Sequence, residues 1–294
     1  MIYLEKFELA SALDEDGFIL SYPYQLEMQC YSHTNVYPFK IFPPKKLQQL
    51  SFDKPIVIFY GGNGSGKSTL LNIIAQKLRL ERSAPFNNTP CFEDYLKLCK
   101  FTASEKDGIP KKSKLIASDD VFDRLLDLRS INEGVEKRRQ MLFEEYEQAR
   151  ELPYLLGGME DLDEFKRRYE AKRKTKSVYV SRRLPKEIDG RSNGESAFAF
   201  FTNEIKEDAL YLLDEPENSL SSKLQTELAA FLEASARFYG CQLVISTHSP
   251  FLLSMKGSRI YDLDRVPVTT AKWTELENVR AYYDFFISHM KEFE

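Results

Sequence analysis

The stretch "IVIFYGGNGSGKSTLLNII", residues 56–74, decides the fold. Its middle, residues 61–68, matches the phosphate-binding pattern G-x-x-x-x-G-K-[ST] without a mismatch. An apolar, β-branched run precedes the glycines, which is typical of a buried parallel strand. The residues after them are apolar at helical spacing. The alternative is a chance glycine-rich turn, but such a turn would not require a strand before it and a helix after it. The stretch therefore predicts a phosphate-binding loop between a strand and a helix.

The chemistry expected of this loop follows from its residue types. Glycines let the backbone turn tightly, so that several N–H groups face phosphate oxygens at a helix N-terminus, where an anion is stabilised. We expect Lys67 to reach the β- and γ-phosphates and the Ser68 hydroxyl to bind Mg²⁺. The complete expected nucleotide-binding set is Gly61, Gly62, Asn63, Gly64, Ser65, Gly66, Lys67, Ser68 and Thr69.

The composition of the whole chain limits its class. It has 294 residues, of which 43% are hydrophobic, as in an ordinary globular protein. Its formal net charge of −4 gives no indication of nucleic-acid binding through overall charge. Its four cysteines are scattered, which suits a reducing compartment. The N-terminal residues lack an apolar signal-peptide core, and no apolar run approaches ~20 residues. We therefore expect a cytoplasmic protein without a membrane segment.

A second motif is the strand-like stretch "ALYLLDEPENSLS", residues 209–221, which ends in Asp214 and Glu215. An acid at the carboxyl end of such a strand is where Mg²⁺ is held, so Asp214 is a candidate metal ligand. Glu215 is a candidate for general-base or water-positioning catalysis. Surface acids after strands are common, so this motif alone is only moderately specific.

A third motif is "QLVISTHSP", residues 242–250, which places His248 after the next apolar strand. Ligands of open parallel sheets gather at strand carboxyl ends, so His248 is expected near the same site, in contact with the γ-phosphate. A purely structural hydrogen bond is the alternative. The turn "RSNGES", residues 191–196, opens a helix and could offer Ser192 and Gly194 to a phosphate, or could simply be a helix cap.

Taken in chain order, G-x-x-x-x-G-K-S, S-N-G-E, apolar-D-E-P, N-S-L-S and S-T-H-S-P make the chain resemble the ABC-class P-loop ATPases. It is similar to the soluble SMC- and RecF-like branch, in particular to compact stand-alone bacterial ATPases, more than to transporter subunits. The resemblance is strong over about 52–80 and 190–290. It implies an α/β fold of ABC-ATPase type, with a mixed sheet, flanking helices and an inserted helical subdomain. It also implies ATP hydrolysis with Mg²⁺.

The resemblance implies roles for single residues. Ser192, Gly194 and Glu195 match the ABC signature, which completes the site of the opposite subunit in an ATP-dependent homodimer. Lys67, Glu215 and His248 match the catalytic positions, and Ser219 to Ser221 match the D-loop. The glutamine that usually binds the metal has no obvious counterpart, and Asp119 is the candidate in its place. The adenine-stacking residue is unassigned; Tyr37 is one possibility, or it could be core.

The expected domain organisation is a nucleotide-binding core of residues 1–90 and 191–294, with a helical insertion at 91–190. Residues 1–60 look strand-rich, including "GFILSY" at 17–22. Two charge-dense segments, residues 132–151 and 160–177, predict helices of a hairpin or small bundle, separated by "LPYLLGGM".

The sequence says less about the molecule on which such an ATPase acts. Residues 165–191 carry eleven Lys or Arg against three acids, which is a solvated helix face or a phosphate-contacting surface for DNA or RNA. A protein partner, such as a toxin or nuclease, is the alternative load, through the insertion or the aromatic tail "AYYDFFISHM", residues 281–290. A transporter nucleotide-binding subunit is a further alternative and would need a membrane partner.

Overall fold

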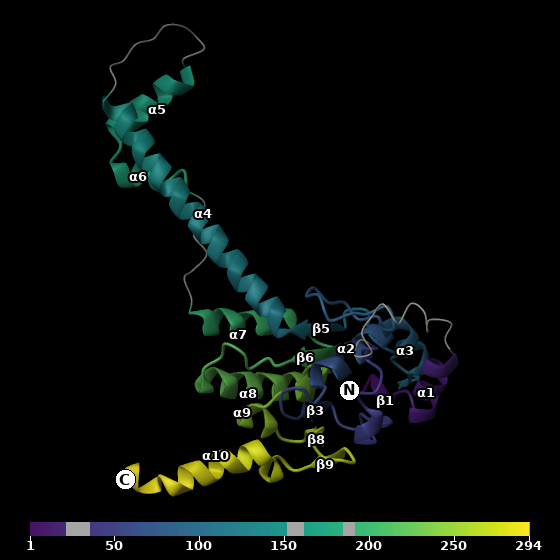
Figure 1. Cartoon of the computed structure of the whole chain (residues 1–294). Helices are drawn as coiled ribbons and strands as arrows, with labels where there is room; N and C mark the ends of the chain where they lie inside the picture. The colour runs from purple at the N-terminus through teal and green to yellow at the C-terminus, as the bar shows by residue number, and fades with distance from the viewer. Residues whose placement is uncertain (22–35, 152–161, 185–191, 294) are drawn as a thin grey trace. The chain divides into compact units, whose positions relative to one another are not determined.

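The computed structural model describes residues 1–21, 36–151, 162–184 and 192–293 (Figure 1). The chain divides into two compact units, one of Met1–Val121 with Asn193–Glu294 and one of Phe122–Ser192. The second unit thus begins at Phe122, whereas the sequence suggested an insertion from residue 91. The reason is that residues of the intervening helix α3 (Phe92–Leu98) and strand β5 (Lys114–Ala117) are buried in the main core of the first unit.

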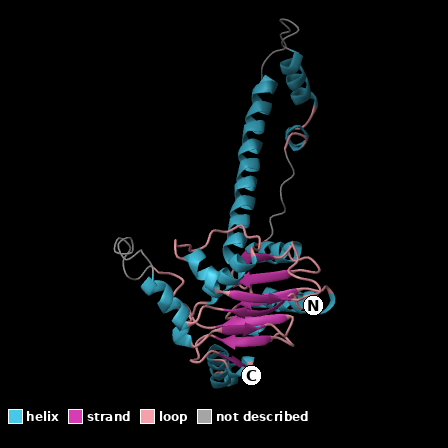
Figure 2. Ribbon diagram, turned by 90° about the vertical axis from the view of Figure 1, so that its right-hand side faces the viewer, coloured by secondary structure: helices cyan, strands magenta, loops and turns pink. Residues whose placement is uncertain are grey.

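A six-stranded mixed sheet forms the centre of the first unit, in the order β5-β6-β7-β3-β8-β9 (Figure 2). Neighbouring strands are parallel except for the edge strand β9, which is antiparallel to β8. The bounds of the remaining strands are β3 Ile56–Tyr60, β6 Leu210–Asp214, β7 Gln242–Ser246, β8 Arg259–Asp262 and β9 Thr269–Ala271. The expected α/β fold with a mixed sheet and flanking helices is confirmed.

The central strands are buried on both faces, as expected of parallel strands that are covered by helices. Every residue of β3 and β7 is buried, and so are the first four residues of β6. Strand register then aligns their carboxyl ends: Ser246 pairs with Asp214 on one side and with Phe59 on the other. This alignment brings the residues that follow the three strands to one edge of the sheet.

A small antiparallel sheet accompanies the large one and has the order β2-β1-β4. Its strands are β1 Leu4–Glu8, β2 Gln49–Ser51 and β4 Lys100–Ala103. Gln242, fully buried at the start of β7, joins the two sheets. Its Oε1 accepts from the N–H groups of Tyr3 at 2.7 Å and Leu4 at 2.8 Å, and its Nε2 donates to the Leu4 carbonyl at 2.8 Å.

Helices fill the remaining connections of the first unit. Their bounds are α2 Lys67–Leu78, α7 Asn193–Glu204, α8 Ser222–Phe238, α9 Pro250–Leu253 and α10 Glu277–Ser288. Among the described residues, no helix has both the length and the apolar character needed to cross a bilayer.

The expectation of strand at "GFILSY" is wrong. Helix α1 occupies Ala12–Ser21, and its start is capped by its own sequence. The Ser11 hydroxyl accepts from the N–H of Asp14 at 3.1 Å, while the Asp14 carboxylate accepts from the N–H of Ser11 at 3.2 Å. This reciprocal pair is a capping box, which favours a helix over a strand for the apolar residues that follow.

The second unit is helical. Helix α4, Ser118–Glu151, is continuous for 34 residues and extends from the first unit into the second; α5 (Leu162–Arg173) and α6 (Lys176–Ser181) follow. A small core holds this unit together, formed by Leu142, Tyr146, Ala171, Tyr179 and Val180. The segment "LPYLLGGM" lies outside the described residues.

Candidate functional site

The phosphate-binding loop occupies the connection from β3 to α2, as its sequence predicts. Gly66 is the N-cap of α2 and has φ +97°, a left-handed conformation that a side chain disfavours. A Cβ there would also meet the Ile41 side chain at 3.3 Å. At the other end of the loop, the Asp264 carboxylate accepts from the Gly62 N–H at 2.7 Å. Both ends of the loop are therefore held by the rest of the fold.

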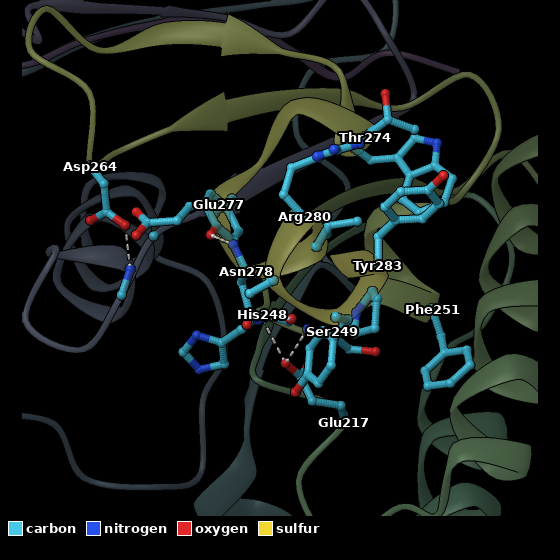
Figure 3. Close-up of a pocket in the computed structure, with 18 of the residues that line it drawn as sticks. Glu217, His248, Ser249, Phe251, Asp264, Thr274, Glu277, Asn278, Arg280 and Tyr283 are labelled. Atoms are coloured by element: carbon cyan, nitrogen blue, oxygen red, sulfur yellow. Dashed lines mark hydrogen bonds between the residues drawn. The ribbon is translucent and has the colours of Figure 1, made fainter. Parts of the chain in front are cut away.

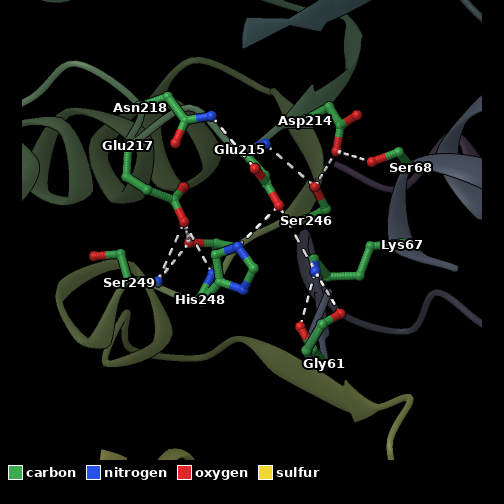
Figure 4. Close-up of polar contacts among 12 residues, drawn as sticks. Gly61, Lys67, Ser68, Asp214, Glu215, Glu217, Asn218, Ser246, His248 and Ser249 are labelled. Atoms are coloured by element: carbon green, nitrogen blue, oxygen red, sulfur yellow. Dashed lines mark hydrogen bonds and ion pairs between the residues drawn. The ribbon is translucent and has the colours of Figure 1, made fainter. Parts of the chain in front are cut away.

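Lys67 is buried, with 5% of its side chain exposed. Its ammonium group donates to the carbonyls of Gly61 at 2.8 Å and Gly62 at 3.2 Å, and lies 3.7 Å from Oε1 of Glu215 (Figure 4). The cation thus lies between the loop and the acid that follows β6. This placement suits an incoming phosphate, which would offer the ammonium group charged oxygens in place of neutral carbonyls.

Ser68 and Asp214 meet at the end of β6. The Ser68 hydroxyl donates to Oδ1 of Asp214 at 3.1 Å, and the Ser246 hydroxyl donates to the same oxygen. Burial raises the pKa of Asp214, against the lowering effect of these two hydrogen bonds. The described residues contain no cluster of three or more metal-binding side chains. One hydroxyl and one carboxylate fit Mg²⁺, which keeps several waters and binds through few protein ligands together with phosphate oxygens.

Glu215 directly follows Asp214 and has a left-handed backbone, with φ +49°. The N–H of Glu215 donates to the carbonyl of Ser246 at 3.0 Å and to the hydroxyl of Ser246 at 3.2 Å. Non-glycine residues rarely adopt this conformation, and such residues cluster at functional sites. The hydrogen bond from His248 lowers the pKa of Glu215 to about 2, so the carboxylate is charged at neutral pH.

His248 completes the cluster. Its Nε2 lies 2.9 Å from Oε1 of Glu215, and this hydrogen bond raises the pKa of His248 above its ordinary value. The His248 carbonyl accepts from the side-chain amide of Asn278 on α10 at 3.2 Å. The structure thus brings Lys67, Ser68, Asp214, Glu215 and His248 into a continuous set of polar contacts. The assignment of catalytic roles to them stays a prediction.

The residues matched to the signature lie at the start of α7. Gly194 approaches Ser219, which was matched to the D-loop, and the start of α8 so closely that a Cβ would lie 3.2 Å from the Ser219 carbonyl and 2.9 Å from the Leu224 side chain. Ser192 and Glu195 are exposed beside it. Ser219 itself has φ +69°. Two segments that the sequence separates by about 25 residues therefore touch at Gly194.

Two further sequence expectations concern Asp119 and Tyr37. Asp119 is exposed at the start of α4, two residues beyond Ala117, which pairs with Asp214 across β5 and β6. Its metal-binding role stays a prediction. The Tyr37 hydroxyl donates to Oγ1 of Thr69 at 3.1 Å, so this tyrosine reaches the loop helix.

A hollow of about 1310 Å³ borders the site on the side of α10 (Figure 3). Its lining includes residues that sequence reasoning missed, among them Glu217, Asp264 and Asn278. The repeated acids of "DEPEN" and "DLD" were the available signal for the first two. Nothing in the sequence around Asn278 indicated contact with His248, because the two residues are 30 positions apart.

The side chains of the basic segment are described from residue 166 to residue 184, while 185–191 lie outside the described residues. Three of its basic residues pair with acids of the same unit. Glu170 accepts from Lys174 at 2.9 Å and from Arg183 at 2.8 Å, and Lys176 pairs with Glu147. These pairs agree with the solvated-helix interpretation for part of the segment.

The sequence profile of one protein family, described as "AAA domain, putative AbiEii toxin, Type IV TA system", matches residues 100–254. The match covers more than half of the chain. It includes Asp214, Glu215 and His248 and begins after the phosphate loop. A search of curated proteins found no match.

Similar solved structures include a "putative metal-chelate type ABC transporter" in an inward-facing conformation, at 18% identity and a TM-score of 0.38, covering 81% of this chain and 82% of that one. A dimeric ATP-binding cassette in a post-hydrolysis state with ADP and Pi has 18% identity and a TM-score of 0.34, covering 76% and 88%. A dimeric bacterial ABC transporter cassette has 18% identity and a TM-score of 0.35, with the same coverage.

Proposed function

Because the chain belongs to the family described as "AAA domain, putative AbiEii toxin, Type IV TA system", we propose that it is an ATP-hydrolysing switch that dimerises around ATP and Mg²⁺. One observation carries the proposal above the others. Lys67 of the phosphate loop lies within 3.7 Å of Glu215, and Glu215 lies within 2.9 Å of His248. Three segments distant in sequence thus supply a phosphate-binding cation, an acid and a histidine to one place.

Binding follows from the loop. Its N–H groups and Lys67 surround the β- and γ-phosphates, and Thr69 lies near the α-phosphate. Ser68 and Asp214 would hold Mg²⁺, which would neutralise charge on the phosphate oxygens. On binding, Lys67 exchanges the carbonyls of Gly61 and Gly62 for phosphate oxygens.

Hydrolysis is a transfer of the γ-phosphoryl group to water. The water oxygen forms a bond to the γ-phosphorus, the bond from that phosphorus to the β–γ bridging oxygen breaks, and ADP leaves with the bonding electrons. The proton that the water loses passes to an oxygen of the transferred phosphoryl group, which is released as phosphate. A carboxylate with a pKa of about 2 is a weak base, so Glu215 serves mainly to orient the water through a charged hydrogen bond. His248 holds Glu215 in place and contacts the γ-phosphate.

Dimerisation supplies the rest of the site. Ser192, Gly194 and Glu195 of one chain cap the γ-phosphate held by the other, in keeping with the ABC resemblance. The packing of Gly194 against Ser219 supports this role, because it joins the signature to the D-loop. Loss of the γ-phosphate then removes the group that bridges the two chains, and they separate.

DNA is the first candidate for the molecule on which the switch acts, and it would bind to the basic residues of 165–191. Binding there would be to the phosphate backbone and would weaken steeply with salt. A protein partner such as a toxin or nuclease is the second candidate, favoured by α10. This helix exposes a group of large apolar side chains, Tyr282, Tyr283, Phe285, Phe286 and Ile287, and such patches mark protein-interaction sites.

The test uses the Glu215→Gln variant, which should bind ATP and hydrolyse it poorly. We would measure its mass in solution with and without ATP and Mg²⁺, and titrate it onto labelled duplex DNA across a salt series. A second version would carry Arg167→Glu and Lys172→Glu. Its control would carry Lys111→Glu and Lys112→Glu, the same charge change at exposed positions of the first unit.

ATP-dependent dimers that bind DNA, and lose it with the Arg167 and Lys172 changes only, would support the DNA-binding switch. ATP-dependent dimers indifferent to DNA would favour a protein partner. A chain that stays monomeric with ATP bound would refute the composite site.

A further inference from the structure

One carboxylate outside the expected catalytic set organises the segment that carries His248. Oε1 of Glu217 accepts three hydrogen bonds from consecutive residues, as Figure 4 shows. The donors are the Thr247 hydroxyl at 2.6 Å, the His248 N–H at 2.9 Å and the Ser249 N–H at 3.2 Å. Residues 247–249 lie where the chain leaves the sheet. The Thr247 N–H is still bonded within the sheet, to the carbonyl of Phe59 in β3 at 3.2 Å. Beyond the end of β7, Glu217 therefore accepts the backbone hydrogen bonds that a neighbouring strand accepts within the sheet.

The surroundings of Glu217 show that this arrangement is specific. Only 8% of the residue is exposed, and its second oxygen, Oε2, is buried without a hydrogen-bond partner among the described residues. A buried carboxylate is costly unless it is well bonded, and an unmade bond adds to that cost. Concentrating all three bonds on one oxygen fixes the backbone at residues 247–249 while it leaves the other oxygen unused.

The held backbone determines where the imidazole lies. Glu217 fixes the N–H of His248, and Asn278 of α10 binds its carbonyl. Between these two anchors the side chain turns toward Glu215, to the 2.9 Å contact. Ser249 has an additional anchor, because its hydroxyl donates to Gln225 at 2.7 Å.

We propose that Glu217 is a positioning residue for ATP hydrolysis: its Oε1 holds residues 247–249 so that His248 stays within hydrogen-bonding reach of Glu215. This inference rests on the proposed function, since it assigns Glu217 a part in the same reaction. Glu217 touches no reacting atom in this role. It acts through the geometry of His248, and a misplacement of about 1 Å in a catalytic site can lower a rate by about 100-fold.

The experiment compares Glu217→Ala with Glu217→Gln in the full chain. Alanine removes the acceptor, while glutamine keeps an oxygen in the same position. The matched control is Glu233→Ala, because Glu233 also accepts a backbone N–H, that of Lys256 at 2.6 Å, on an exposed part of the first unit. The measured quantities are kcat and KM for ATP hydrolysis and the pKa of His248 by NMR. The chain has three histidines, so a His248→Gln spectrum assigns the signal.

We expect Glu217→Ala to lower kcat by about 10- to 100-fold with KM within about threefold of the wild type. The pKa of His248 should fall, because the bond to Glu215 that raises it is lost. The other charges that act on His248 are Glu217 itself and Lys67, so Glu217→Gln measures the direct charge effect separately. Glu217→Gln should recover most of kcat, and Glu233→Ala should match the wild type.

Wild-type kcat in Glu217→Ala, or a loss of kcat with an unchanged pKa of His248, would overturn the inference. So would a Glu217→Gln variant as slow as Glu217→Ala. If the alanine variant does not fold, Glu217→Asp takes its place, since the shorter side chain withdraws the oxygen from its donors. A wild type without ATPase activity would instead refute the proposed function, and the pKa of His248 would still test the placement.

Discussion

The imidazole of His248 and the carboxylate of Glu215 lie 2.9 Å apart although 33 positions separate them in the chain. Their contact follows from strand register. Asp214 and Ser246 are paired across β6 and β7, so the residues that follow them leave the sheet at the same level. Glu215 then turns in a left-handed conformation and meets the histidine. The pairing of two apolar strands is thus what places an acid beside a histidine.

Replacing His248 by Ala should slow ATP hydrolysis and leave ATP binding nearly intact. The hydrogen bond that holds Glu215 is lost, and with it a contact to the γ-phosphate. We expect kcat to fall by about 100-fold, and the Kd for ATP to change by less than about threefold. Single-turnover hydrolysis and equilibrium titration would measure the two. The corresponding change of the half-buried His289, directly after α10, should alter neither, and equal losses in both variants would contradict a role for His248.

Replacing Ser68 by Ala should raise the Mg²⁺ concentration needed for hydrolysis. The Ser68 hydroxyl contacts Asp214 at 3.1 Å, and together they form the proposed metal-binding pair. Loss of one of so few protein ligands should shift the half-maximal Mg²⁺ concentration upward by about 10-fold or more. The control is Thr226→Ala, which removes an exposed hydroxyl on α8. An unchanged Mg²⁺ titration in Ser68→Ala would contradict the metal assignment.

Replacing Gly194 by Val should abolish ATP-dependent dimerisation without abolishing ATP binding. Even a Cβ at this position would lie 2.9 Å from Leu224 and 3.2 Å from the Ser219 carbonyl, so α7 must shift. Gly134→Val is the matched control, because a Cβ there meets nothing within 4 Å. Mass measurements with ATP and Mg²⁺ would show the difference. Dimers of Gly194→Val with wild-type affinity would argue against the signature assignment.

Replacing Glu15 by Gln should stabilise the protein at high pH only. Glu15 is 1% exposed, and burial raises its pKa from 4.5 to about 7. A group with a raised pKa in the folded state contributes stability below its unfolded pKa, and this contribution is lost as the pH rises through about 7. Glutamine avoids the buried charge and keeps an oxygen for the Lys40 N–H, which Glu15 accepts at 2.6 Å.

We therefore expect Glu15→Gln to raise the free energy of unfolding by about 1–3 kcal/mol at pH 8 and to have little effect at pH 4. Denaturant unfolding at both pH values would measure this. Glu5→Gln, the same chemical change at an exposed position of β1, is the control. A Glu15→Gln effect equal at both pH values would contradict a buried charge as its cause.

The fold class could be predicted because its determinants are local. The strand, glycine loop and helix of residues 56–74 follow one another in the sequence, and β6 and β7 are short apolar runs with polar residues at their ends. Where local signals competed, the prediction was wrong: residues 17–21 read as a strand, but the Ser11–Asp14 capping box makes them helical. Residues 132–151 were expected to form a helix of their own, whereas they are the second part of α4, which is continuous from Ser118 to Glu151.

The sequence by itself determined the loop, the acids after β6 and the histidine after β7, because each depends on spacing within a few residues. Only the tertiary structure decided that Lys67 lies beside Glu215, that Asp264 holds Gly62, and that Glu217 and Asn278 hold the backbone of His248. Those contacts join residues 30 to 202 positions apart. They depend on strand order, register and the packing of α10, which no local pattern of residues specifies.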